Sequence, residues 1–82
     1  MNKRFKVKDE YRHNALSRRK GGYTLVKHNK DGSETVYDKI KYPPGYADTM
    51  FRNDTTQEIL RIEVLNPITQ EILQVYEQQI KS

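Results

Sequence analysis

The chain has 82 residues, no cysteine and a formal net charge of +4. This length allows a single domain, and the absence of cysteine excludes disulfides, thiol nucleophiles and thiolate metal sites. No apolar run approaches the roughly 18 residues of a membrane span, and no apolar segment follows the charged N-terminus as in a secretory signal. We therefore expect no membrane partner, and a cytoplasmic protein, or a virion protein if the chain is viral.

The positive charge is concentrated at the N-terminus. Residues 1–20 have eight basic and two acidic side chains, a net charge of +6, whereas residues 21–82 have seven basic and nine acidic side chains, a net charge of −2. A basic segment on a nearly neutral body indicates an anionic partner. We therefore divide the chain into a basic N-terminal arm, residues 1–20, and a small antiparallel β-domain, residues 21–82.

The arm has two short patterns. Residues 5–8 alternate apolar and basic side chains, which permits a short strand. Asp9–Lys20 has acidic residues at its start and basic residues at its end, as the helix dipole favours, and Gly21-Gly22 would end a helix there. Because this segment is too polar to hold a helix alone in water, we expect it to be ordered only where it docks.

The body begins with a predicted hairpin. Tyr23–His28 is the first strand, Asp31-Gly32 favours a tight turn, and Glu34–Lys41 is the second strand. Asp38 falls on the same face as the apolar Val36. This break in the pattern indicates a bulge or a sheet edge.

The next segment is predicted to be irregular. Tyr42-Pro43-Pro44-Gly45-Tyr46 contains two prolines, which cannot donate hydrogen bonds to a sheet, so we expect a loop. Asp48–Arg52 then forms a weak third strand or a short turn of helix.

The clearest hairpin pattern is Glu58–Glu77. Leu60, Ile62 and Val64 fall on one face of an extended chain, and Asn66–Gln70 has the residues of a tight turn. The same arrangement, an asparagine followed five residues later by a glutamate, also begins at residues 29 and 53. Repeated turns of this kind favour an antiparallel β-meander.

A helix is the alternative for residues 67–80. Asn66 could then be the N-cap and Pro67 the first helical residue. Leu73 fits the apolar face of such a helix poorly. We therefore predict a strand to about Tyr76, followed by a helical or frayed tail.

Together these patterns predict a mainly β protein: a small antiparallel β-meander of about five short strands, which could also curl into a small barrel. Hydrophobic residues make up only 34% of the chain, so the core is modest. An open meander also has two unpaired edges. Both points lead us to expect a homo-oligomer or a protein partner bound through the sheet edges.

The basic side chains are the candidate nucleic-acid-binding residues. Lysine and arginine neutralise phosphates, and the release of counterions makes that contact favourable. Phe5, Tyr11 and His13 lie among them and could stack on bases. The predicted phosphate contacts in the arm and on the first hairpin are Lys3, Arg4, Lys6, Lys8, Arg12, Arg18, Arg19, Lys20, Lys27, Lys39 and Lys41.

Nothing in the sequence indicates catalysis. There are two histidines, without the spacing of a zinc site, and there is neither a glycine-rich phosphate loop nor a nucleophile elbow. Glu34, Glu58 and Glu71 occupy equivalent turn positions, which favours a structural role. We therefore expect no enzyme activity, no metal site and no cofactor.

The leading hypothesis is a non-enzymatic module whose basic arm contacts the phosphate backbone of a nucleic acid, as in a viral or mobile-element accessory protein. The first alternative is a structural or assembly protein, such as a virion component or an oligomer-forming β-module, whose arm and sheet edges dock on neighbouring subunits. The second alternative is a small inhibitor of a nucleic-acid enzyme. The sequence leaves all three open.

Overall fold

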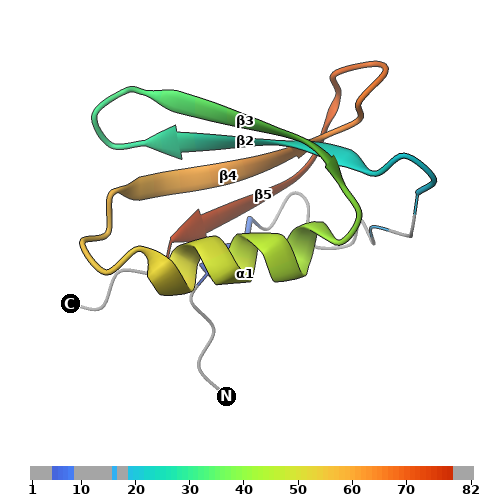
Figure 1. The fold of residues 1–82 in the computed structure, drawn as a ribbon. Helices are drawn as coiled ribbons and strands as arrows, with labels where there is room; N and C mark the ends of the chain where they lie inside the picture. The colour runs from blue at the N-terminus through green and yellow to red at the C-terminus, as the bar shows by residue number, and fades with distance from the viewer. Residues whose placement is uncertain (1–4, 9–15, 17–18, 79–82) are drawn as a thin grey trace.

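The computed structural model describes residues 5–8, 16 and 19–78 (Figure 1). Within these residues the protein is mainly β, as predicted, with antiparallel strands and one helix. Four strands have seven residues each, and a three-residue strand extends the sheet beside the last of them. The elements are β1 (Phe5–Val7), β2 (Tyr23–Asn29), β3 (Glu34–Ile40), α1 (Pro43–Asn53), β4 (Ile59–Leu65) and β5 (Ile72–Gln78).

The strand order of the sheet is β1-β5-β4-β2-β3. The β2–β3 and β4–β5 hairpins are therefore as predicted, but β4 pairs with β2 and not with β3. A simple meander is wrong for this reason: β3 and β4 run parallel, with β2 between them and α1 as the crossover, in a split β-α-β arrangement. The sheet of the described residues is open, with β1 and β3 at its edges, so the alternative of a closed barrel is also wrong.

Helix α1 replaces the predicted loop at Tyr42-Pro43-Pro44-Gly45-Tyr46. At Asp48–Arg52, where either a weak strand or a short turn of helix was predicted, the helix is confirmed and the strand is wrong. Pro43 and Pro44 lie in the first turn, where a helix needs no backbone donor, so the prolines start the helix instead of preventing one. Ala47 and Phe51 are four residues apart and both are buried. The segment is helical because this apolar face is stabilised by packing against the sheet.

The core lies between α1 and one face of the sheet (Figure 1). Side chains from the three central strands meet the buried face of the helix there. The core residues are Tyr23, Leu25, Ala47, Phe51, Ile59, Ile62, Val64 and Tyr76.

Two bulges decide which side chains reach this core. In β3, Asp38 and Lys39 lie opposite a single β2 residue, and Lys39 has a φ of 60°, so the bulge predicted at Asp38 is confirmed. In β4, the register with β2 skips Leu60. As a result Leu60 is 47% exposed and Ile59 is buried in its place, so the prediction that Leu60 shares the buried face of Ile62 is wrong.

The β4–β5 turn follows the predicted chemistry. The Oδ1 atom of Asn66 accepts hydrogen bonds from the backbone N–H groups of Ile68 at 2.8 Å and Thr69 at 3.2 Å. Strand β5 then runs to Gln78. The alternative of a helix across residues 67–80 is therefore wrong up to that point. The strand also continues two residues beyond its predicted end at about Tyr76, and the rest of the predicted tail lies outside the described residues.

Candidate nucleic-acid interface

Much of the predicted basic arm lies outside the described residues, so its contacts stay a prediction. This applies to Lys3, Arg4, Arg12 and Arg18, and to the side chain of Lys6. Tyr11, His13 and the Phe5 side chain, which were predicted to stack on bases, also lie outside the described part. Lys8 is described and half-buried, and its backbone N–H donates to the carbonyl oxygen of Val75 at 3.1 Å.

Four predicted contact residues gather where β2 begins and β3 ends. Arg19 and Lys20 directly precede the Gly21-Gly22 turn into β2, and Lys39 and Lys41 lie at the end of β3. The two segments are neighbours because Tyr23 at the start of β2 pairs with Ile40 at the end of β3. We call Arg19, Lys20, Lys39 and Lys41 the basic end.

Gly22 makes this close approach possible. Its φ is +78°, and a Cβ atom at this position would lie 2.7 Å from the carbonyl carbon of Lys39. Only glycine adopts that conformation without cost, and only glycine leaves room for the neighbouring backbone. The N–H of Gly22 also donates to the carbonyl oxygen of Arg19 at 2.9 Å, which fixes the turn beside Lys39.

The four charges of the basic end are not held in ion pairs with described residues. Within the described part of the chain, none of its four side chains makes an ion pair. Lys20, Lys39 and Lys41 are exposed, and Arg19 is half-buried. Like charges held together without partners raise the local potential and attract a polyanion.

Two tyrosines near the basic end are accessible. Tyr42 directly follows Lys41 and is 66% exposed. Tyr46 is partly exposed and packs edge-on against Tyr37, with ring centroids 5.5 Å apart. Tyr23 and Tyr76, by contrast, are core residues. Tyr42 is therefore the tyrosine best placed to stack on a base beside the cations.

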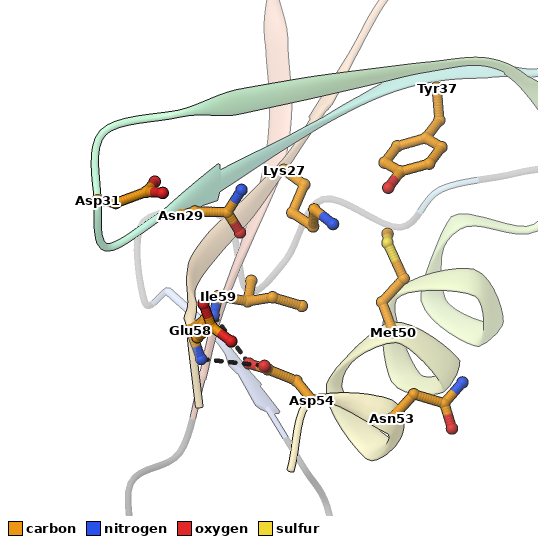
Figure 2. A pocket seen from close by; sticks show the side chains of 9 residues that line it. All are labelled: Lys27, Asn29, Asp31, Tyr37, Met50, Asn53, Asp54, Glu58 and Ile59. Atoms are coloured by element: carbon orange, nitrogen blue, oxygen red, sulfur yellow. Dashed lines mark hydrogen bonds between the residues drawn. The ribbon is translucent and has the colours of Figure 1, made fainter. Parts of the chain in front are cut away.

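Lys27 does not join the basic end, although it was predicted with that group. It lies toward the opposite end of β2, in a pocket of about 400 Å³ between the sheet and the C-terminal half of α1 (Figure 2). Its ammonium group is 5.8 Å from the centroid of the Tyr37 ring. The pocket residues are Lys27, Asn29, Asp31, Tyr37, Met50, Asn53, Asp54, Glu58 and Ile59.

Asp54 is an acidic residue of this pocket, and its carboxylate accepts three hydrogen bonds. Its Oδ1 atom accepts the Glu58 N–H at 3.0 Å, and its Oδ2 atom accepts the Ile59 N–H at 2.8 Å and the Gln78 side-chain amide at 2.6 Å. Burial alone would raise the pKa of Asp54, but these hydrogen bonds and the charge of Lys27 outweigh it and lower the pKa below its ordinary value. Asp54 therefore stays ionised at neutral pH.

Three carboxylates line the pocket together with Lys27, which is the single cation among its described residues. Hydrogen bonds from the Ser33 hydroxyl and N–H lower the pKa of Asp31, which is exposed at the pocket rim. The Glu58 carboxylate accepts a hydrogen bond from Thr56 at 2.6 Å. Because its described residues include three carboxylates and one lysine, the pocket does not favour a polyanion.

A cluster of charged side chains around His28 lies on the sheet face away from α1. The His28 Nε2 atom is 2.7 Å from Glu63 Oε1, and its Nδ1 atom is 3.1 Å from Glu34 Oε2. Arg61 contacts Glu63 as well, at 3.4 Å. The two carboxylates lie on opposite sides of the ring, which links β2 to both of its neighbours. Sequence reasoning missed this cluster, although the Asp31-Gly32 turn places Glu34 opposite His28.

A group suited to hold a metal ion is absent from the residues that the structure describes. The helix found there is also too short and too polar to cross a membrane. A scan against protein-family models finds no match for this chain, and searches of curated proteins and of solved structures find none either.

Proposed function

We propose that this protein is a non-enzymatic module that binds nucleic acid, with the basic end and the N-terminal arm as its phosphate contacts. The observation that supports this proposal is the basic end itself. Two segments far apart in the sequence bring Arg19, Lys20, Lys39 and Lys41 together without an ion-pair partner among the described residues.

The contacts are of two kinds. The cations neutralise successive phosphates and release their counterions, which gives affinity that does not depend on base sequence. Tyr42, exposed next to Lys41, stacks on a base and favours a single strand or a loop, where bases are accessible. The carboxylates of the pocket repel the phosphates, so the nucleic-acid backbone lies at the basic end of the β2–β3 hairpin and not at the pocket end.

Fluorescence anisotropy with labelled single- and double-stranded DNA and RNA tests the proposal. The double variant Lys20→Gln/Lys41→Gln removes two charges from the basic end. Its matched control, Lys30→Gln/Arg52→Gln, removes two exposed charges outside the basic end. Each phosphate contact contributes about 0.7–0.9 to the slope of log K against log salt, so we expect the first variant to lose about 1.5 from that slope.

The control variant should keep the slope of the native protein. Equal losses in the two double variants would show that net charge alone attracts the nucleic acid, and would contradict a defined interface. The absence of binding at low salt to any of the four nucleic acids would overturn the proposal.

An assembly protein is the second candidate, and one specific observation favours it. Among the described residues, strand β3 is an edge of the sheet, and most of its side chains are exposed. An exposed edge strand offers unpaired backbone groups to which a strand of another chain can add. Sedimentation over a range of protein concentrations tests this candidate, because an assembly protein forms oligomers that persist at moderate salt.

A further inference from the structure

We propose that the free edge of β3 binds an extended segment of another protein, in which two basic residues flank an apolar residue at alternate positions. This is a second surface, separate from the basic end, and its partner is a polypeptide. The recognition site is the straight part of the strand, Glu34–Asp38, which ends at the bulge at Lys39.

The direction of the backbone groups identifies which residues are free to pair. The N–H of Asn29 donates to the carbonyl oxygen of Ser33, so these two residues form a hydrogen-bonded pair of the β2–β3 ladder. Hydrogen-bonded and non-hydrogen-bonded pairs alternate along an antiparallel ladder, so every second β3 residue after Ser33 also bonds to β2. Thr35 and Tyr37 therefore direct their backbone groups toward β2. Those of Glu34, Val36 and Asp38 point outward, away from the sheet.

The side chains of the outward-directed residues also share one face. Glu34 pairs with His28 and Val36 with Val26, and Asp38 accepts a hydrogen bond from Thr24, so all three lie on the face away from α1. Val36 is 58% exposed between two carboxylates. An added strand would meet an acid, an apolar residue and an acid at successive positions of this face.

The position of the Glu34 carboxylate is set by His28. The Nδ1 atom of His28 contacts Glu34 Oε2, while its Nε2 atom is held by Glu63. One oxygen of Glu34 is thus engaged, and the side chain remains 57% exposed. Asp38 is also held through a single oxygen, Oδ1. Both carboxylates keep an oxygen for a cation on a neighbouring strand.

Antiparallel β3–β3 pairing with a second copy of this chain is unfavourable in the registers centred on Val36 and on Tyr37. An antiparallel pair of β3 strands centred on Val36 places Glu34 opposite Asp38 twice, and like charges directly opposite each other are destabilising. A pair centred on Tyr37 places the bulge at Lys39 opposite Thr35, which interrupts the ladder. Lysine or arginine opposite Glu34 and Asp38, with an apolar residue opposite Val36, satisfies both the charges and the ladder.

The test uses two labelled peptides, with the central sequences Thr-Lys-Thr-Val-Thr-Lys-Thr and Thr-Glu-Thr-Val-Thr-Glu-Thr, and the full-length protein. We expect the lysine peptide to bind about tenfold more tightly in fluorescence anisotropy, because two favourable cross-strand pairs replace two unfavourable ones. Equal affinity of the two peptides would overturn the proposal.

Two variants show whether the contact is at this edge. Val36→Pro removes an N–H that points outward, so it should abolish binding and leave the β2–β3 ladder intact, whereas Val36→Thr keeps that N–H and should retain binding. Circular dichroism confirms that both variants fold. Unchanged peptide binding by a folded Val36→Pro variant would overturn the proposal, as would a native dimer that this variant dissociates.

Charge reversal gives a readout that misfolding cannot imitate. The variant Glu34→Lys/Asp38→Lys should prefer the glutamate peptide by about tenfold. The control Glu58→Lys/Glu71→Lys makes the same change in net charge at exposed positions outside β3 and should still prefer the lysine peptide. If both variants change preference alike, the recognition is not at β3.

Discussion

The two ends of the β2–β3 hairpin have opposite electrostatic character. The basic end holds four cations without an ion-pair partner in the described chain, whereas the pocket end combines Lys27 with Asp31, Asp54 and Glu58. The difference arises from what adjoins each end. At the pocket end, α1 ends and β4 begins, which brings Asp54 and Glu58 beside β2. The net charge of a small protein therefore says little about which of its lysines is available.

The largest effect is expected at the glycine of the basic end. In Gly22→Ala, the new Cβ atom meets the backbone of Lys39 and Ile40 at 2.7–2.9 Å in a left-handed conformation. We expect a loss of about 2–5 kcal/mol in the free energy of unfolding, measured in urea.

Gly32→Ala is the matched control for that substitution. Its φ of +92° is similar, but nothing lies within 4 Å of the new Cβ atom. The conformational cost alone, about 1–2 kcal/mol, should remain. Equal losses in the two variants would mean that the close approach at Gly22 does not contribute to the change in the free energy of unfolding.

A smaller effect is expected at the pocket end from Asp54→Asn. The amide keeps an acceptor oxygen but loses the charge-assisted hydrogen bonds to the Glu58 and Ile59 N–H groups. We expect a loss of about 1–3 kcal/mol at neutral pH.

The pH dependence of this loss follows from the lowered pKa of Asp54. The unfolded state takes up the proton first as the pH falls, so the stabilisation is complete above the unfolded pKa and is lost as the pH falls through the folded pKa. The difference between native protein and variant should therefore shrink in acid. A difference that is constant from pH 7 to about pH 2 would contradict this account.

The smallest effect is expected from Lys27→Gln. Because Lys27 lies in the pocket with Asp54, its loss should leave the salt slope of nucleic-acid binding unchanged, whereas Lys41→Gln should lower that slope by about 0.7–0.9. The anisotropy titrations described above measure both. A reduced slope for Lys27→Gln would place the pocket end in the interface after all.

Local patterns in the sequence predict the four long strands and their two hairpins, because alternation and turn residues act over a few positions. The same reasoning fails at Pro43 and Pro44, since a proline that starts a helix and a proline that prevents one look alike without knowledge of the sheet beneath. It fails again at Leu60, where a bulge opposite β2 exchanges the buried and exposed positions.

The candidate site could be predicted from the sequence only where its residues belong to a single hairpin. The Asp31-Gly32 turn sets the register that brings the start of β2 to the end of β3, so the approach of the segment before β2 to the segment after β3 could have been predicted from the sequence. The pocket joins Lys27 to Asp54, which comes from beyond α1. That contact depends on the crossover and has no local signal.

The split β-α-β arrangement also determines when the sheet can form. The pairing of β2 with β4 joins distant residues, as the 35-residue separation of His28 and Glu63 illustrates, and such contacts carry a large loop-closure cost. We expect the two hairpins to form early and their joining to limit the folding rate. During synthesis on the ribosome, β2 then cannot pair with β4 until β4 has emerged. Slower folding of Ile62→Val, with unfolding little changed, would support this order; the reverse pattern would contradict it.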